Sequence, residues 1–357
     1  MVCMILQSRS QDQKAQVNVA LDRNISWGGC HGGFEQTHGW SNHDIGRGFE
    51  HASAAYRSGG LKMVAGRVRF GGIEAGGTKF VLGVGISPHD ILARTSVPTT
   101  SPAETLKAIV DWFGTQPPIA ALGIGSFGPV DLDAESTTWG YITQTTKPGW
   151  TNAKIAPALR SALNVPVSFD TDVNGAVLGE AKWGAAQGCQ SAVYITVGTG
   201  IGGGVIIDGR TVHGLGYPEM GHIFPARHPD DHEFAGICRF HGACCEGLAS
   251  GPAIIARYGV PLSDLPSVHP AHDLIAWYLA QLTHSVQAIA APQRIILGGG
   301  VMKTPGLIAR ILVAAATLGG GYFAGRADTI IAPPALGENS GLLGAFALAQ
   351  QALEASR

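Results

Sequence analysis

The sequence predicts an α/β protein in which two lobes are each centred on a β-sheet. Short apolar strands alternate with helices from Arg67 onward, and a length of 357 residues suits two lobes of ordinary size. Two similar glycine-rich turns, Gly72–Thr78 and Val197–Gly203, lie far apart in the chain between apolar strands. A duplicated unit would set two phosphate-gripping turns opposite each other; two unrelated hairpins are the alternative.

Apolar runs and helix signals place the elements in a regular order. Strands are expected at Phe70–Glu74, Phe80–Gly85, Ala120–Ser126, Val167–Asp170, Ala192–Val197, Gly204–Ile207 and Arg294–Leu297. Helices are expected at Pro102–Gly114, Asn152–Leu163, Asn174–Ala186, Gly251–Tyr258, Ala271–Ala290, Gly306–Leu318 and Ser340–Glu354. This alternation is the pattern of a sheet covered by helices.

The N-terminal part of the chain differs from the rest. Gln7–Gln16 is polar, and Ser26–His51 mixes Gly, His, Asn and Trp with no strand or helix period. We expect residues 1–66 to be a disordered extension. It is either an over-long start or a real appendage of unknown role.

Composition excludes several classes of protein. The chain is 14% charged with a formal net charge of -2, which argues against a nucleic-acid or membrane-surface footprint. No apolar run approaches membrane-spanning length, and Met1–Leu6 lacks the basic start of a secretory signal. We therefore expect a cytoplasmic protein.

Three glycine clusters favour a nucleotide ligand. Gly198–Gly203 matches G-x-G-x-x-G, but the next residues read as a strand, so the dinucleotide-binding interpretation fails. Gly76–Lys79 has Thr and Lys in the wrong order for a Walker loop. The bare backbone N–H groups of such turns can still approach phosphate oxygens closely, and Gly298–Gly300 follows a further strand.

A compact group of cysteines and histidines predicts a metal site. Cys238, His241 and Cys244 form Cys-x-x-His-x-x-Cys, and His222 lies upstream. Two thiolates and two imidazoles match a closed tetrahedral zinc site, with His228 and His232 open as alternatives to His222. A cluster of buried thiols without metal is the other interpretation.

Three carboxylates are candidates for chemistry. Asp172 follows a strand and opens a helix, where we expect it to stay ionised and to accept a proton from a bound alcohol. An N-cap role is its alternative. Glu219 and Glu246 flank the metal loop and suit sugar hydroxyls, although solvated surface glutamates are as common.

From Phe70 to Ala349 the chain resembles the ROK family of sugar kinases, specifically its zinc-containing bacterial fructokinase branch. The segments that carry the resemblance are Gly71–Lys79, Gly125–Pro129, Gly140–Thr143, Lys147–Trp150, Thr171–Asn174, Thr196–Gly203, Pro218–His222, Cys238–Glu246 and Ala249–Pro252.

The resemblance implies an actin/hexokinase-type ATPase fold, ribonuclease H-like, with two lobes of mixed sheets around a cleft. Residues 67–188 with the C-terminal helix 340–357 would form the small lobe. Residues 189–339 would form the large lobe, with a zinc loop at 222–246. Because members of this family are often dimers, a homodimer is a candidate assembly.

The resemblance also implies a reaction: phosphorylation of a hexose by ATP with Mg²⁺, with D-fructose converted to D-fructose 6-phosphate. Asp172 would be the general base, and Thr171, Glu219, Glu246 and Gly128 would bind the sugar. The implied nucleotide-binding residues are Gly76, Gly77, Thr78, Lys79, Gly198, Thr199, Gly200, Pro252, Gly299 and Gly300. The implied ligands of a structural Zn²⁺ are His222, Cys238, His241 and Cys244.

Two positions depart from the patterns of related proteins, and two other functions are alternatives. Glu74 stands where the wider superfamily usually has Asp, which leaves its contact with Mg²⁺ open, and Thr171 stands where glucose-specific members have Asn. A kinase for glucose, mannose or an N-acetylated hexosamine is one alternative. A non-catalytic sugar sensor of the same family is another, but residues 1–62 do not read as a winged helix-turn-helix.

Overall fold

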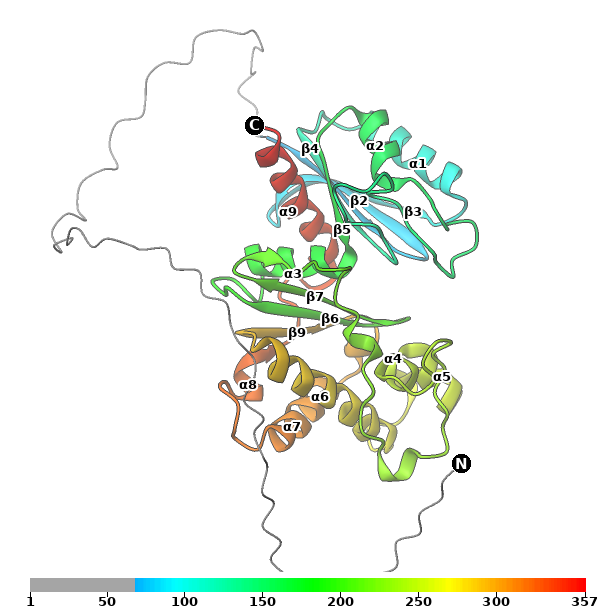
Figure 1. Cartoon of the computed structure of the whole chain (residues 1–357), viewed down its shortest axis with the longest axis vertical. Coiled ribbons are helices and arrows are strands. Elements are labelled where there is room, and N and C mark those ends of the chain that lie inside the picture. The colour runs from blue at the N-terminus through cyan, green and yellow to red at the C-terminus, as the bar shows by residue number, and fades with distance from the viewer. Residues whose placement is uncertain (1–67) are drawn as a thin grey trace, which may run out of the picture. The chain divides into compact units, whose positions relative to one another are not determined.

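The computed structural model describes residues 68–357 (Figure 1). The expectation that residues 1–66 form a disordered extension concerns residues outside this range. The first strand begins shortly after them, at Phe70. Among the described residues, no helix is both long and apolar enough to cross a lipid bilayer.

The first sheet contains five strands in the order β3-β2-β1-β4-β5. β1 pairs antiparallel with β2 and parallel with β4, so the sheet is mixed. Its strands are β1 Phe70–Ala75, β2 Lys79–Ser87, β3 Asp90–Pro98, β4 Ala121–Ser126 and β5 Val167–Thr171.

The second sheet repeats this topology, with the order β10-β9-β6-β7-β8. β6 pairs antiparallel with β7 and parallel with β9, as β1 does with β2 and β4. Its strands are β6 Ala192–Val197, β7 Ile201–Ile207, β8 Arg210–Thr211, β9 Arg294–Gly298 and β10 Ile331–Ala332. The topology therefore confirms the internal repeat over two unrelated hairpins, and the turns β1–β2 and β6–β7 are equivalent.

Helices pack on both sheets, as the alternation predicts. Those of the described residues are α1 Pro102–Gly114, α2 Ile155–Leu163, α3 Asp172–Trp183, α4 Cys245–Ala249, α5 Gly251–Tyr258, α6 Ala271–Ala290, α7 Leu307–Gly319, α8 Ala327–Ile330 and α9 Ser340–Ala355. In Figure 1, α3 lies next to β6 and β7, whereas α9 lies against β4 and β5, and the contacts between elements agree. Each sheet thus packs against a helix that follows the last strand of the other.

Small residues allow α3 and α9 to cross closely. A Cβ on Gly179 would lie 2.8 Å from the backbone nitrogen of Gly344, so a larger residue would separate the helices. Near the end of α3, the fully buried carboxylate of Glu180 accepts hydrogen bonds from the backbone N–H groups of Ala185, Ala335 and Leu336 and from the hydroxyl of Ser340. This satisfied carboxylate fixes the start of α9 against α3.

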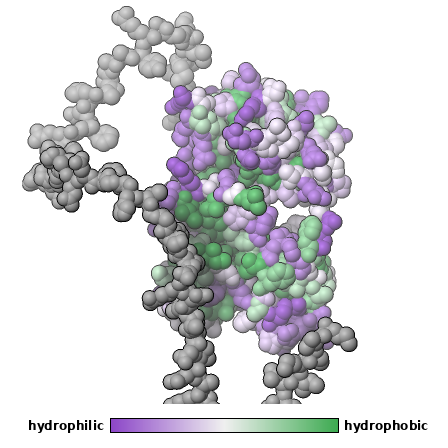
Figure 2. Space-filling view, in the orientation of Figure 1, coloured by the Kyte–Doolittle hydropathy of each residue, from purple (hydrophilic) through white to green (hydrophobic). Residues whose placement is uncertain are grey.

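Polar and apolar side chains are concentrated on different parts of the face shown in Figure 2. Hydrophobic residues gather at mid-height, over α3 and the second sheet, while polar residues dominate over the first sheet.

The structure corrects several expected boundaries. β3 was not predicted, because its residues alternate between half-buried and exposed and none is fully buried, so it lacks an apolar signal. α2 begins at Ile155 rather than Asn152, because Asn152 has φ 62°. α3 begins at Asp172, with Thr171 as its N-cap, and ends at Trp183 rather than Ala186.

The most informative correction concerns the glycines of β7. The sequence reading places Gly202 and Gly203 in a turn, but β7 begins at Ile201 and includes both. Added Cβ atoms on Gly203 and Gly204 would overlap Met220 and the backbone of Val173. These glycines therefore let α3 and the segment after β8 pack directly on the strand.

Candidate active site

The centre of the candidate site is the junction between β5 and α3. Thr171 caps the helix, with its hydroxyl accepting the N–H of Asn174 at 3.1 Å. Asp172 is the first helical residue, is partly buried, and accepts the N–H of Val173 at 2.9 Å. The N-cap role that was the alternative for Asp172 belongs to Thr171, which leaves the second carboxylate oxygen of Asp172 available.

The surroundings of Asp172 make it a proton acceptor near neutral pH. Burial raises its pKa to about 7, and the nearby charges of Glu74 and Glu219 add to the rise. The expectation that the helix N-terminus keeps Asp172 ionised is therefore corrected, because burial and two neighbouring carboxylates outweigh it. A general base works best with a pKa close to the working pH.

Carboxylates continue from Asp172 towards the metal loop. Burial raises the pKa of Glu219, with His222 opposing the rise and Glu246 adding to it. Glu246 lies next to the β6–β7 turn, because its Oε2 accepts the N–H of Ile201 at 2.9 Å. On the other side, burial raises the pKa of Glu74 against the opposing charges of Arg94 and Lys79. Acidic groups thus run from β1 through α3 to α4.

The turn between β1 and β2 is held by a residue that the sequence analysis missed. The hydroxyl of Thr99 donates to the carbonyl of Gly76 at 2.7 Å, and its N–H donates to the carbonyl of Thr78 at 2.9 Å. An added Cβ on Gly77 would meet nothing within 4 Å. The turn is therefore rigid, with open space over its tip beside Lys79.

The turn between β6 and β7 is held by the start of α5. The carbonyl of Gly198 accepts the N–H of Gly251, the first residue of α5, at 2.8 Å. A Cβ on Gly198 would lie 3.9 Å from the backbone nitrogen of Gly300, so the turn is adjacent to the end of β9. Gly299 has φ 96° and approaches the backbone of Val197. The structure thus brings Gly198, Thr199 and Gly200 together with Gly299, Gly300 and Pro252.

The four predicted metal ligands form one cluster. The donor atoms of His222, Cys238, His241 and Cys244 all lie within 4.8 Å of one another. The Nδ1 atoms of the two histidines are 3.3 Å apart, and the Nδ1 of His222 lies 3.8 Å from the Sγ of Cys238 and 3.6 Å from that of Cys244. Tetrahedral zinc bonds of about 2.3 Å to sulfur and about 2.0–2.1 Å to nitrogen imply ligand separations of about 3.3–3.8 Å. The cluster is compatible with zinc, and His222 rather than His228 or His232 completes it.

A buried polar network also holds the metal loop, and the sequence analysis did not predict it. The carboxylate of Asp231 accepts two hydrogen bonds from Arg257, both at 3.1 Å, and one from the hydroxyl of Tyr278 at 2.7 Å. The guanidinium of Arg257 also lies 4.0 Å from the ring centroid of Phe234. Because charge, hydrogen bonds and ring contact combine here, this network stabilises the loop independently of a metal.

Two further residues at the site, His213 and Tyr217, escaped the sequence analysis. His213 lies after β8, and its Nε2 is 3.0 Å from Oδ2 of Asp170, which is 2% exposed. Tyr217 approaches the segment after β4, where its hydroxyl accepts the N–H of Val130 at 3.1 Å. A Cβ on Gly128 would lie 2.5 Å from that hydroxyl. No local pattern could have predicted these contacts, because their partners are distant in sequence.

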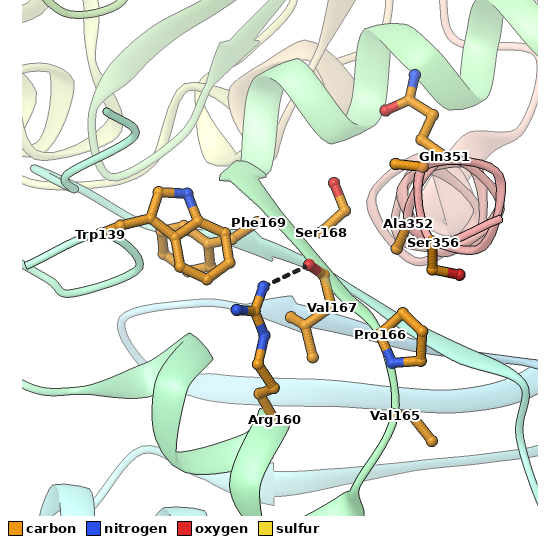
Figure 3. A pocket seen from close by; sticks show the side chains of 11 residues that line it. Trp139, Arg160, Val165, Pro166, Val167, Ser168, Phe169, Gln351, Ala352 and Ser356 are labelled. Atoms are coloured by element: carbon orange, nitrogen blue, oxygen red, sulfur yellow. Dashed lines mark hydrogen bonds between the residues drawn. The ribbon is translucent and has the colours of Figure 1, made fainter. Parts of the chain in front are cut away.

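A surface groove of about 450 Å³ lies elsewhere, between α2, β5 and the end of α9 (Figure 3). Arg160 lies over the ring of Trp139 and donates to the carbonyl of Val167 at 3.3 Å. None of the residues that the sequence analysis selects lines this groove. We therefore place the site at the α3 N-terminus rather than in the groove.

Duplicated mixed sheets, equivalent glycine turns and an acidic residue at the intervening helix define a two-lobed phosphotransferase class of protein. Residues 70–352 match the model of the ROK family, and the chain belongs to that family. Over 288 residues, covering 78% of this chain and 96% of the relative, it is 48% identical to a fructokinase from Zymomonas mobilis. A fructokinase from Lactococcus lactis is 44% identical over 68% of this chain and 83% of its own.

Solved structures agree on the fold. A ROK hexokinase from Thermus thermophilus superposes with a TM-score of 0.66 at 28% identity, covering 81% of this chain and 100% of that chain. The protein therefore has the actin/hexokinase-type fold that the sequence resemblance implies.

Proposed function

We propose that this protein is an ATP-dependent sugar kinase that converts D-fructose to D-fructose 6-phosphate. Relatives named fructokinase, 40–48% identical over most of the chain, support the reaction and the substrate. The observation that carries the chemistry is Asp172, whose burial raises its pKa to about 7 at the junction of β5 and α3.

The reaction needs a sugar hydroxyl to replace ADP on the γ-phosphorus. The hydroxyl oxygen forms a bond to phosphorus while the bond to the β,γ-bridging oxygen breaks, and Asp172 takes the hydroxyl proton. Because the transition state is loose, positioning and charge neutralisation supply most of the rate enhancement.

We assign the phosphates of ATP to the two equivalent turns. Gly76, Gly77, Thr78 and Lys79 would hold them from the first half, and Gly198, Thr199 and Gly200 from the second. Pro252, Gly299 and Gly300 would surround the adenosine. Mg²⁺ bound with ATP would neutralise phosphate charge, and the nearby carboxylates suit a hard cation.

We assign the sugar to a position next to the carboxylate of Asp172. Thr171, Gly128, Glu219 and Glu246 would line it, with the two glutamates accepting hydrogen bonds from hydroxyl groups. Since Oε2 of Glu246 already accepts the N–H of Ile201, its other oxygen is the one available to a sugar.

We assign a structural Zn²⁺ to His222, Cys238, His241 and Cys244, as expected for the zinc-containing branch. Burial raises the pKa of Cys244 to about 11 without metal, so a dication would be needed to keep this thiol ionised. The ion would brace the loop between Glu219 and Glu246 and take no part in the chemical step.

We also propose that residues 67–188 with 340–357 form one lobe, that residues 189–339 form the other, and that the two lobes close on the substrates. The enzyme is proposed to be cytoplasmic and to form a homodimer. A coupled ADP-release assay with ATP, Mg²⁺ and a panel of hexoses tests the function. Release dominated by fructose is expected. Release dominated by glucose, mannose or an N-acetylated hexosamine would change the substrate, and no release from folded protein would favour a sugar sensor.

A further inference from the structure

The segment between β8 and Glu219 ties the two halves of the protein together. At its start, His213 contacts Asp170 on β5, and near its end Tyr217 accepts the N–H of Val130 after β4. Both partners belong to the first half, whereas β8 belongs to the second sheet. Tyr217 therefore reaches across from one half to the other, two residues before Glu219.

The hydroxyl of Tyr217 has a fixed position. Its oxygen accepts the N–H of Val130 at 3.1 Å. A Cβ on Gly128 would lie 2.5 Å from this oxygen and 3.5 Å from Cζ, so only glycine leaves room for the hydroxyl. The absent side chain at Gly128 and the hydroxyl of Tyr217 are thus complementary.

The proton of this hydroxyl has no protein acceptor. Within residues 68–357, the only hydrogen bond of the Tyr217 side chain is the one it accepts from Val130. Burial raises its pKa to about 12, with the charges of Glu219, Asp172 and Asp170 adding to the rise, so the proton is retained. This half-buried O–H lacks a protein acceptor and lies close enough to Glu219 and Asp172 for their charges to raise its pKa, so it can donate to a ligand bound beside them.

We propose that Tyr217 contacts the sugar and donates a hydrogen bond to one oxygen of the hexose, beside Asp172 and Glu219. The inference rests on the proposed hexose kinase function. Because its oxygen already accepts from Val130, Tyr217 acts as a donor and selects for an oxygen at one position of the substrate.

The test compares wild-type protein with Tyr217→Phe. The Kd for fructose is measured by calorimetry without ATP, and KM and kcat are measured by ADP release. Losing one hydrogen bond should raise both the Kd and the KM for fructose about 10-fold. The KM for ATP should stay within about twofold, because Tyr217 is not among the residues assigned to the nucleotide.

Monodeoxy analogues of fructose locate the contact. In wild-type protein, the analogue that lacks the contacted hydroxyl should bind about 10-fold more weakly than fructose, because it leaves the Tyr217 donor unpaired. The same analogue should lose little in Tyr217→Phe. Equal penalties in both proteins for every analogue would contradict the proposal.

Tyr278→Phe is the matched control. It also removes a hydrogen-bonded tyrosine hydroxyl from the second half, but that hydroxyl donates to Asp231 in the metal-loop network. Tyr278→Phe should lower the melting temperature and leave the Kd for fructose unchanged. If Tyr217→Phe behaves in the same way, Tyr217 is only structural and the proposal is wrong.

Gly128→Ala provides a second variant in case Tyr217→Phe fails to fold. The added methyl group should displace the hydroxyl and weaken fructose binding while leaving the tyrosine in place. Unchanged binding would overturn the proposal. Wild-type protein that binds and phosphorylates no hexose would instead overturn the proposed function, so the two failures are distinguishable.

Discussion

The two halves of this protein share a strand order but differ most in the connection after their third strand, β3 or β8. After β3 the first half reaches α1 through residues 99–101, whereas after β8 the second half reaches α6 through residues 212–270. The long connection carries the candidate metal ligands together with Glu219 and Glu246. The two sheets therefore share one topology, and this connection is an asymmetric insertion in it that carries residues proposed to bind the sugar.

In each half, the connection after the third strand (β3 or β8) holds the glycine turn of that half. In the first half Thr99 holds the β1–β2 turn, and in the second Gly251 and Glu246 hold the β6–β7 turn. The insertion thus replaces a single threonine with a segment that also carries the metal cluster. Damage to the insertion should reach the second turn and spare the first.

The largest effect should follow Asp172→Asn, which removes the proposed general base. We expect kcat to fall about 10²–10⁴-fold in the ADP-release assay, the usual contribution of a general base. Wild-type kcat/KM should rise with pH through about 7 as Asp172 ionises. Turnover close to wild type in Asp172→Asn would remove Asp172 from the mechanism.

The same variant should gain stability at high pH. Burial raises the pKa of Asp172 from 3.8 to about 7, so ionisation in the folded protein costs stability between these pH values. Asp172→Asn should therefore melt above wild type at pH 8, and the difference should vanish near pH 4. A constant difference across this range would contradict the raised pKa.

The next effect concerns the metal cluster. Cys238→Ser should release about one zinc per chain and lower the melting temperature, as measured by elemental analysis and thermal unfolding. Hydrogen exchange should increase in residues 212–270 and remain unchanged in β1–β5. Cys189→Ser is the matched control, because this half-buried cysteine lies outside the cluster. Wild-type protein without zinc would reject the site.

A smaller effect should separate the two glycine turns. Gly200→Ala places a Cβ 2.6 Å from Oε2 of Glu246, so it should lower the melting temperature and raise the KM for both substrates. Gly77→Ala meets nothing within 4 Å and should leave the melting temperature unchanged. If the space over Gly77 holds a phosphate, the KM for ATP should still rise about 10-fold. Equal melting temperatures for both variants would show that the second turn is not braced through Glu246.

Local sequence patterns predicted the parts of the site that local chemistry defines. Cys-x-x-His-x-x-Cys fixes three candidate ligands on one loop, and the strand-to-helix junction fixes the place of Asp172. The fold class followed from alternating apolar strands and helices, but β3 has no fully buried residue and left no signal.

Contacts between distant segments could not be predicted in this way. Tyr217 meets Val130 and His213 meets Asp170 only because the segment after β8 folds back onto the first half. The glycines of β7 illustrate the same limit: sequence alone suggests a turn, whereas the structure uses them for close packing against α3. A glycine in the sequence indicates that a larger side chain would not fit at that position, but only the folded structure shows which segment occupies the space.

The smallest effect should come from His213, which joins the insertion to β5. Its hydrogen bond to Asp170 raises the pKa of His213, so protonation contributes stability that is full below about pH 6.5 and is lost as the pH rises through the raised value. Thermal unfolding of His213→Gln should therefore show its largest loss relative to wild type at pH 6 and a smaller one at pH 9. The titration of Asp172 is common to both proteins and cancels in this difference. His89→Gln is the control substitution, because His89 is an exposed histidine in the β2–β3 turn. A loss that is independent of pH would mean that His213 joins the halves as a neutral donor rather than as a cation.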